Sequence, residues 1–318
     1  MRVRWADPGG MGILVVAMAF APGHVTGLFV PDLEGPDPRS RGSRGAGIVL
    51  DVGARARVEL RELRADATRI EVLQGGLPVS FPITELALRL LVPSHGYTVR
   101  VELRHELPVS HGFGMSAAGT LASAMALAQC LGLPVERAHE AAHRAEMELH
   151  GGLGGVSAIL GGGLEVRRVA GVPPYGKVER TPHSRGFFAA FLRDPLPSPP
   201  LLGNPEFLAR VAALGTPLLG DLPPPPVPWT RFFEASLEFS RGLALGGSAL
   251  TATLGRVTES GVPAFQAMMG NTLVASPPDE DSEGRLVTLL RRAGFTILRV
   301  HVGRTGAIPL GPDTADAS

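Results

Sequence analysis

A glycine-rich loop at residues 108–119, with the sequence PVSHGFGMSAAG, runs directly into a long alanine-rich stretch. Glycine lets the backbone adopt positive φ angles and approach a ligand closely. The first amide groups of a helix have no intrahelical partner and carry partial positive charge, so together they attract anions. Ser116 would cap such a helix and face a phosphate or a metal ion. A plain glycine turn capped by Ser116 is the alternative, and the loop alone does not decide between the two.

Potentially reactive side chains continue downstream, where His139, Glu140 and His143 form the pattern H-E-x-x-H. On a helix this spacing puts two imidazoles on one face, as in zinc hydrolases that use the glutamate as a general base. Glu146 and His150 fall near the same stripe and could complete such a site. Two solvent-facing histidines on an amphipathic helix are the alternative that we favour for this short pattern.

The elements that must position these residues follow from residue patterning and chain breakers. Strands are predicted in the first half at residues 13–20, 46–60, 98–103 and 164–169, and helices at 116–131 and 135–149. In the second half, helices are predicted near 205–213, 229–245, 247–257 and 282–293, and strands at 272–275 and 296–302. Proline-rich stretches at 171–176, 195–200 and 223–228 predict surface connections. We place two domains at 1–175 and 176–318, with a loose tail after residue 311.

The apolar stretch at residues 11–30 has the length of a membrane span, but Pro22 and Gly23 interrupt it. We therefore expect a buried strand that runs into a loop, and no membrane partner. The family resemblance described below begins near Met18, which would also be a plausible start of the chain. Residues 1–7 would then be an extension.

The composition limits the kinds of function. The chain has 318 residues and a formal net charge of zero, so nothing indicates the basic face that a nucleic-acid partner requires. Lys177 is the only lysine and lacks the glycine spacing of a Walker A loop. Cys130 is the only cysteine and lies in an apolar stretch, which predicts a buried structural thiol and no intrachain disulfide. This fits a reducing cytoplasm.

Three segments resemble the GHMP kinase superfamily, in the expected order. The loop at 108–119 is similar to its second signature, Gly-Leu-Gly-x-Ser-Ser/Ala-Ala before a helix, with Phe113 in place of leucine. Residues 20–24 (FAPGH) resemble the first signature, and residues 265–272 (FQAMMGNT) the third. More narrowly, APGHVTGLF at 21–29, GSRGAG at 42–47 and MMGNT at 268–272 resemble the pantoate kinases of archaea.

The resemblance extends over roughly residues 18–305, and it implies both a fold and an activity. The fold would be α+β with two domains: an N-terminal domain like ribosomal protein S5 domain 2 and a ferredoxin-like C-terminal domain, with the site between them. The activity would be the ATP- and Mg²⁺-dependent phosphorylation of the primary hydroxyl of pantoate to 4-phosphopantoate, for coenzyme A synthesis. The family also suggests a homodimer.

The resemblance further implies roles for individual residues. The nucleotide would be bound by Pro108, Ser110, Gly112, Gly114, Met115, Ser116, Ala117, Ala118 and Gly119. Ser116 and Glu146 would hold Mg²⁺, which prefers one or two carboxylates together with phosphate oxygens and water. A surface glutamate is the alternative for Glu146. The expected catalytic residues are Ser116, Glu146 and His150.

The acceptor would be bound by residues of the first signature and of the 42–47 segment. A planar arginine suits the carboxylate of pantoate through bidentate contacts, and Arg44 beside Ser43 is the candidate. A solvated arginine in a turn is the alternative. His24 and Thr26 could bind hydroxyl groups or position the substrate.

One position departs from the family pattern. Residues 152–156 read GLGGV, so Gly155 stands where the family often has an aspartate that accepts the hydroxyl proton. Catalysis could rest on positioning and charge stabilisation, which dominate phosphoryl transfer. Alternatively, Ser157, His150 or Glu148 could substitute for the aspartate. The chain could also be a nucleotide- or metabolite-binding relative without turnover, or a kinase for another small alcohol such as mevalonate or homoserine.

Overall fold

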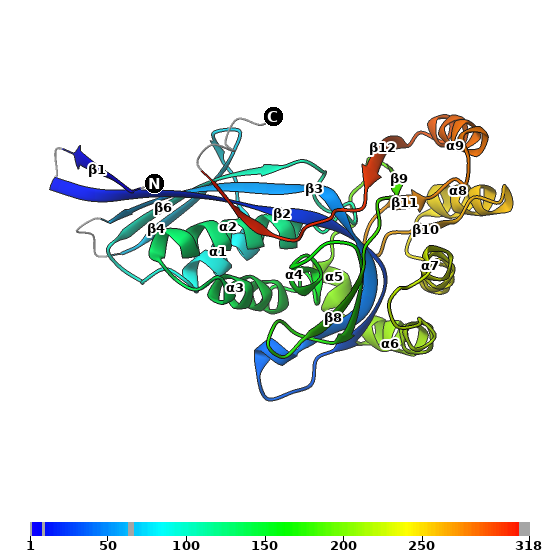
Figure 1. The fold of residues 1–318 in the computed structure, drawn as a ribbon, viewed down its shortest axis with the longest axis horizontal. Coiled ribbons are helices and arrows are strands. Elements are labelled where there is room, and N and C mark those ends of the chain that lie inside the picture. The colour runs from blue at the N-terminus through cyan, green and yellow to red at the C-terminus, as the bar shows by residue number, and fades with distance from the viewer. Residues whose placement is uncertain (1, 8–9, 63–66, 312–318) are drawn as a thin grey trace.

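A ribbon of two long antiparallel strands runs through the molecule (Figure 1). The computed structural model describes residues 2–7, 10–62 and 67–311, and the ribbon comprises β2 (Gly10–Asp32) and β3 (Gly42–Glu62). β2 continues through Pro22 and Gly23, where a strand ending in a loop was predicted. Its pairing with β3 is irregular between Pro22 and His24 and again between Thr26 and Leu28. Pro22 and Gly23 therefore lie at an irregularity in the pairing with β3 and do not end the strand. Proline and glycine often occur at such positions.

Within the described residues the ribbon belongs to the larger of two sheets. Its main path has the order β1 (Arg2–Asp7), β2, β3, β6 (Tyr97–His105), β4 (Arg69–Gln74) and β5 (Leu77–Pro78). β7 (Leu164–Val169) pairs with both β3 and β8 (Lys177–Thr181), and β13 (Ile308–Leu310) pairs with β2. The β4–β6 pair is parallel and the other pairs are antiparallel.

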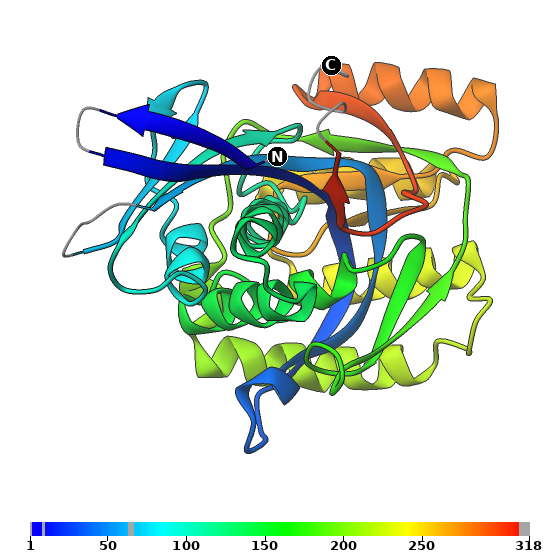
Figure 2. The same ribbon diagram turned by 60° about the vertical axis from the view of Figure 1, so that its left-hand side comes forward.

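Helices cover one face of this sheet (Figures 1 and 2). They are α1 (Pro82–Arg89), α2 (Met115–Leu131), α3 (Val135–Glu148) and the short α4 (Gly155–Ala158). α2 packs directly on β2 and β3, and α1 and α3 pack against α2. Because α2 is buried on nearly all sides, it needs the uncharged, alanine-rich sequence that it has. α3 buries a stripe of alanines together with His143 and Glu146, and exposes most of its other charged side chains.

A smaller antiparallel sheet, with the order β10-β11-β9-β12, lies in the second half of the chain. Its strands are β9 (Gly186–Phe191), β10 (Ala264–Gln266), β11 (Thr272–Ala275) and β12 (Thr296–His301). The helices of this half are α5 (Pro199–Leu202), α6 (Pro205–Gly220), α7 (Trp229–Leu243), α8 (Ser248–Glu259) and α9 (Glu280–Arg292). A 3₁₀ turn, η1 (Pro38–Ser40), follows β2. α6 and α7 pack on β2, so the ribbon reaches into both halves.

The predicted helices at 116–131 and 135–149 are confirmed to within one residue, and the α+β class is confirmed. Helix α1 was not predicted. Most of the predicted tail lies outside the described residues, and the division into domains at residue 175 stays a prediction. Within the described ranges, no helix is long and apolar enough to cross a membrane, and the apolar stretch at 11–30 forms strand β2.

Candidate active site

Three segments that are far apart in sequence meet at the N-terminus of α2. They are the bulged part of β2, the loop at 108–119 and residues 267–272. The amide of His24 donates to the carbonyl of Phe113 at 2.9 Å, and the amide of Met268 donates to the carbonyl of Thr26 at 2.9 Å. The Thr272 hydroxyl donates to the carbonyl of His111 at 2.5 Å. The three motif segments therefore form one connected structure.

The loop needs its glycines for two physical reasons. Gly112 and Gly114 have φ angles of +88° and +66°, which side chains with a Cβ rarely adopt. A Cβ at Gly112 would lie 3.0 Å from Cα of Gly270, and one at Gly114 would lie 3.2 Å from the carbonyl oxygen of His24. Glycine therefore allows both the turn into α2 and the close packing of the three segments.

A cavity of about 350 Å³ opens beside this junction, and residues from both halves of the chain line it. The predicted site residues that line it are His24, Thr26, Ser43, Ser110, Gly112, Gly114, Met115, Ser116, Ala117 and Glu146. The predicted residues outside the lining are Arg44, Pro108, Ala118, Gly119 and His150. Most of the predicted set is thus brought together by the fold.

Ser116 and Glu146 form a buried pair at the N-terminus of α2. The Ser116 hydroxyl donates to Oε1 of Glu146 at 2.6 Å. Burial raises the pKa of Glu146 from 4.5 to about 7, although the bond from Ser116 acts in the opposite direction. A Cβ at Gly151 or Gly152 would come within 2.6 or 2.9 Å of Oε2 of Glu146, so these glycines leave space beside that oxygen.

This pair fits Mg²⁺ better than it fits a protein-only metal site. Within the described residues, no group of three or more His, Cys, Asp or Glu side chains could hold a metal ion. A single carboxylate with a neighbouring hydroxyl suits Mg²⁺, because this ion takes its other ligands from phosphates and water. When bound, the ion would neutralise charge on the transferring phosphate.

The H-E-x-x-H pattern does not form a zinc site. His143 is 2% exposed, so the expectation of two solvent-facing histidines is wrong for this residue. Its Nε2 bonds to the carbonyl of Arg41 at 2.9 Å and so holds the chain that follows η1. Glu140 forms an ion pair with Nη1 of Arg39 at 2.9 Å. The pattern is therefore structural.

A buried polar cluster also reaches the cavity, where His24, Thr26 and Arg167 line it. Nε2 of His24 lies 2.9 Å from Oε1 of Glu165, and Nδ1 of His24 lies 3.3 Å from the Thr26 hydroxyl. Nη1 of Arg167 donates to the same Glu165 oxygen. Arg167 is 2% exposed and Glu165 is fully buried. Burial tends to raise the pKa of Glu165, but Arg167 and His24 together lower it below its usual range, so this carboxylate is ionised.

Arg167 and Ser43 meet at a glycine-lined part of the cavity. Nε of Arg167 is one of the few buried donors in the described part of the chain that lack a hydrogen-bond partner. A Cβ at Gly154 would lie 2.4 Å from the Ser43 hydroxyl oxygen and 2.9 Å from Nε of Arg167. Buried donors without partners call for an explanation such as an absent ligand. The geometry suits an anion with two oxygens, such as a carboxylate.

Arg44, the predicted carboxylate-binding residue, is placed differently. It is partly exposed, and its Nε lies 3.4 Å from Oδ2 of Asp32. Successive side chains alternate across a strand, so Ser43 and Arg44 on β3 cannot both face the cavity. The structure therefore brings Ser43 to the cavity and places Arg44 outside its lining.

His150 and Gly155 are the two remaining positions that the sequence analysis singled out. His150 is exposed, has a φ of 53° and does not line the cavity. Gly155 does line it, and a Cβ there would lie 2.9 Å from Cβ of Ala117. That distance is shorter than real Cβ contacts, so the local backbone does not accommodate the aspartate of the family pattern without a shift.

Several lining residues were not predicted, and they include Arg167, Pro197, Ser198, Pro199, Met268 and Met269. Residues 195–200 are partly or fully exposed, as expected for a surface connection, and Pro197, Ser198 and Pro199 among them also line the cavity. The amide of Leu196 donates to the carbonyl of Ser110 at 2.9 Å, which ties this segment to the loop. A Glu and an Arg two positions apart on the predicted strand at 164–169 were the signal that could have revealed Arg167.

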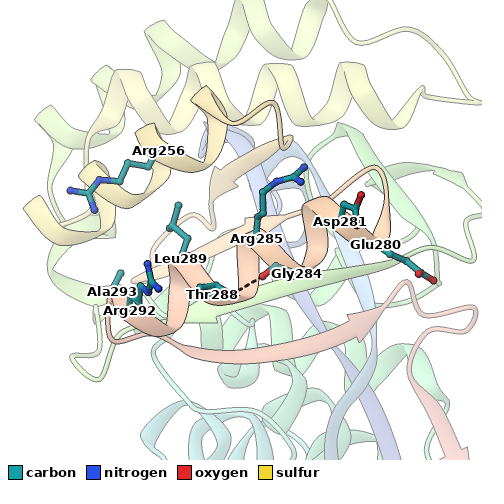
Figure 3. A pocket seen from close by; sticks show the side chains of 9 residues that line it. All are labelled: Arg256, Glu280, Asp281, Gly284, Arg285, Thr288, Leu289, Arg292 and Ala293. Atoms are coloured by element: carbon teal, nitrogen blue, oxygen red, sulfur yellow. Dashed lines mark hydrogen bonds between the residues drawn. The ribbon is translucent and has the colours of Figure 1, made fainter.

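A second hollow, of about 710 Å³, lies on the outer surface over α9 and the end of α8 (Figure 3). Its charged side chains are Arg256, Glu280, Asp281, Arg285 and Arg292. All of them are exposed, and both signs of charge are present. Since solvent can satisfy these groups, the hollow has none of the buried polar donors that mark the first cavity.

The comparisons with known proteins agree with this geometry. Residues 83–163 match the model of the GHMP kinases N terminal domain, a range that contains the loop, Ser116 and Glu146. A pantoate kinase of Methanospirillum hungatei is 29% identical over 257 residues, which cover 79% of this chain and 84% of the relative. A pantoate kinase of Thermococcus kodakarensis is 38% identical over 164 residues, which cover 50% of this chain and 53% of the relative.

Among solved structures, a phosphotransferase related to the CoA biosynthesis pathway has a TM-score of 0.79 and 25% sequence identity. The match covers 93% of this chain and 99% of that structure. The fold, the glycine-rich loop and these relatives together indicate a small-molecule kinase. The chain is similar to GHMP kinases: residues 83–163 match their N terminal domain, and most of the chain aligns with a pantoate kinase and with a solved phosphotransferase.

Proposed function

We propose that this protein is a pantoate kinase, which transfers the γ-phosphate of ATP to the primary hydroxyl of pantoate and forms 4-phosphopantoate. The observation that carries the proposal is the arrangement of one cavity. Its lining contains the loop and the Ser116–Glu146 pair, which suit a magnesium-bound phosphate, and also the Arg167–Ser43 pair, which suits a carboxylate. The relatives named pantoate kinase act on a substrate that has a hydroxyl and a carboxylate.

The loop and the start of α2 would bind the phosphates of ATP. Backbone amides at a helix N-terminus attract phosphate, and no arginine or lysine lies within residues 108–119. Ser116 and Glu146 would hold Mg²⁺, since Ser116 already contacts the carboxylate at 2.6 Å. These residues orient the phosphate chain and balance its charge, which are the main tasks of a phosphoryl-transfer site.

The acceptor would be oriented by its carboxylate. Nε of Arg167 and the hydroxyl of Ser43 would each donate a hydrogen bond to one carboxylate oxygen. The sequence analysis gave this role to Arg44. His24 and Thr26, on the neighbouring β2, would then face the hydroxyl end of the molecule. The ionised Glu165 accepts a hydrogen bond from Nη1 of Arg167 and so fixes the orientation of the guanidinium group.

The resemblance to the family also suggests the domain types, the oligomeric state and the compartment. We infer that the first half corresponds to a domain like ribosomal protein S5 domain 2. We infer that the second half is ferredoxin-like, and the sheet order β10-β11-β9-β12 supports this. A homodimer in the cytoplasm is the state that we propose, on the basis of the family.

Gly155 supports a second candidate, a protein that binds nucleotide and metabolite without turnover. The two are separated by measuring ADP release from Mg·ATP with pantoate, mevalonate and homoserine in turn. We expect ADP release that depends on pantoate, with one phosphopantoate formed for each ADP. ATP binding without turnover on any acceptor would favour the second candidate, and turnover on only mevalonate or homoserine would refute the pantoate assignment.

The acceptor site is tested by the variants Arg167→Gln and Arg44→Gln. Arg167→Gln should raise KM for pantoate by about 10²-fold, since a charged hydrogen bond contributes about 1.5–3 kcal/mol. The dissociation constant for ATP should stay within about threefold, which also shows that the variant is folded. Arg44→Gln is the matched control and should leave KM for pantoate unchanged. The opposite pattern would return the role to Arg44.

A further inference from the structure

The proposed reaction releases a proton that needs an acceptor. The attacking hydroxyl of the acceptor loses its proton as it bonds to phosphorus, and a carboxylate at position 155 is absent. Glu146 is engaged with Ser116 and is assigned to the metal. The other substitutes that the sequence offered are badly placed, because His150 and Glu148 are exposed and neither lines the cavity. Ser157 is buried, and its hydroxyl donates to the carbonyl of Gly154 at 3.1 Å.

A continuous hydrogen-bonded chain starts at the cavity and leads away from it. The hydroxyl of Thr26, which lines the cavity, lies 3.3 Å from Nδ1 of His24. Nε2 of His24 lies 2.9 Å from Oε1 of Glu165. The pairing of β2 with β3 is irregular on either side of His24 and Thr26, between Pro22 and His24 and between Thr26 and Leu28. A Cβ at Gly47 would come within 2.2 Å of Nε2 of His24, so glycine on β3 makes room for the imidazole.

The direction of each hydrogen bond follows from the charges. Glu165 is ionised and can only accept, so Nε2 of His24 carries the hydrogen and donates it. A neutral imidazole has one donor and one acceptor nitrogen, which leaves Nδ1 as the acceptor for the Thr26 hydroxyl. The charged groups that act on His24 are Glu165, Arg167 and Arg180, and burial is the largest influence and lowers the pKa of His24. The imidazole is therefore neutral and able to accept a proton.

We propose that Thr26, His24 and Glu165 form a proton relay that replaces the missing carboxylate at position 155. The inference rests on the proposed kinase activity. The acceptor oxygen forms a bond to the γ-phosphorus, and the bond from that phosphorus to the bridging oxygen breaks, its electron pair leaving with ADP. The acceptor proton passes to Oγ1 of Thr26 while the Thr26 proton passes to Nδ1 of His24. Glu165 balances the imidazolium, and the proton returns to solvent through Thr26 after product release.

In this arrangement Thr26 is the catalytic residue, because its hydroxyl touches the reacting group. His24 accepts the proton through Thr26, and Glu165 is a positioning residue that fixes the tautomer of His24. The logic is that of a serine–histidine–carboxylate triad, with the hydroxyl serving to pass a proton and not as a nucleophile.

The relay is tested with Thr26→Val, Thr26→Ser and Glu165→Gln. Valine keeps the shape of threonine and removes the hydroxyl, whereas serine retains it. General acid–base groups contribute about 10²–10⁴-fold, so Thr26→Val should lower the single-turnover rate at saturating pantoate by about 10²-fold. Thr26→Ser should stay within about fivefold of the wild type on the same scale. The single-turnover rate of Glu165→Gln should fall between those of the two Thr26 variants. In Thr26→Val, the dissociation constants for ATP and pantoate should change less than the rate does.

A proton inventory in mixtures of H₂O and D₂O gives a readout that a purely structural role would not change. If two protons are transferred in the same step, the single-turnover rate should depend on the deuterium content along a curve and not a straight line. We expect this curvature in the wild type and in Thr26→Ser. Thr26→Val should lose this curvature. A Thr26→Val rate near that of the wild type would overturn the relay, and so would a linear inventory in the wild type. Absence of wild-type turnover on pantoate would instead refute the proposed function, and the relay with it.

Discussion

The buried carboxylate of Glu146 makes a prediction that can be worked out in magnitude. Its pKa rises from 4.5 to about 7 in the folded protein because burial disfavours the charged form. At 1.36 kcal/mol per pKa unit, holding this group ionised costs the folded state roughly 3 kcal/mol. The folded protein binds more protons than the unfolded chain between these two pKa values. Stability contributed by this group is therefore fully present below 4.5 and lost as the pH rises through about 7.

The perturbation is Glu146→Gln, which keeps the shape of the side chain and removes its charge at every pH. Relative to the wild type, the variant should become more stable as the pH rises, with a gain of about 2–3 kcal/mol between pH 5 and pH 8. It should also lose most of its affinity for Mg·ATP, because the carboxylate is the expected metal ligand. A carboxylate that destabilises the fold at neutral pH would thus be one that metal binding requires.

The assay is urea unfolding of the wild type and variant at the two pH values, without Mg²⁺ or nucleotide. Buried histidines titrate in both proteins, so their contribution cancels in the difference. Glu148→Gln is the matched control, because Glu148 lies on the same helix but is 43% exposed. Any change in the free energy of unfolding of Glu148→Gln should be smaller than the gain expected for Glu146→Gln. A difference between Glu146→Gln and wild type that is equal at both pH values would refute the reasoning.

Three further predictions concern Gly154, Ser116 and Cys130. Gly154→Ala would place a Cβ 2.4 Å from the Ser43 hydroxyl oxygen, so KM for pantoate should rise at least about tenfold; an unchanged KM in steady-state kinetics would contradict the carboxylate site. Ser116→Ala removes a bond that lowers the pKa of Glu146, so the pH midpoint for Mg·ATP binding, measured by calorimetry, should move upward; a downward move would count against the pair. Burial raises the pKa of Cys130 from 9.0 to about 11, so a disulfide reagent should modify the folded protein about a hundredfold more slowly than the urea-unfolded chain. Equal rates in the two states would show that this thiol is not buried.

The parts of the site that lie in continuous motifs could be predicted from the sequence. Ser116 follows the glycines directly, and Glu146 lies on the next predicted helix, where the resemblance to GHMP kinases singled it out. The strand at 164–169 was also predicted, but nothing local indicates its partner. β7 pairs with β3 in a register that sets Gly45 opposite Arg167 and Gly47 opposite Glu165. Only this long-range pairing brings Arg167 and Glu165 to the cavity.

The differences between the sequence-based expectations and the structure have a common origin, because the same local sequence is compatible with two structures. Pro22 and Gly23 can end a strand or produce a bulge, and here pairing with β3 on both sides keeps the strand intact. Arg44 and Ser43 are adjacent in sequence, yet the strand alternation sends them to different faces. His143 satisfied a metal-binding pattern but is buried against the carbonyl of Arg41. Such choices depend on packing that adjacent residues do not encode.

The continuity of the β2–β3 ribbon has a mechanical consequence. α2 packs on one part of the ribbon, and α6 and α7, from the second half of the chain, pack on β2. A rotation of one half against the other must therefore bend or twist two hydrogen-bonded strands, and a strand is most compliant where its pairing is interrupted. Those interruptions are the bulges beside His24 and Thr26. A change in the angle between the halves should therefore also change the spacing of His24 and Thr26, the groups of the proposed relay.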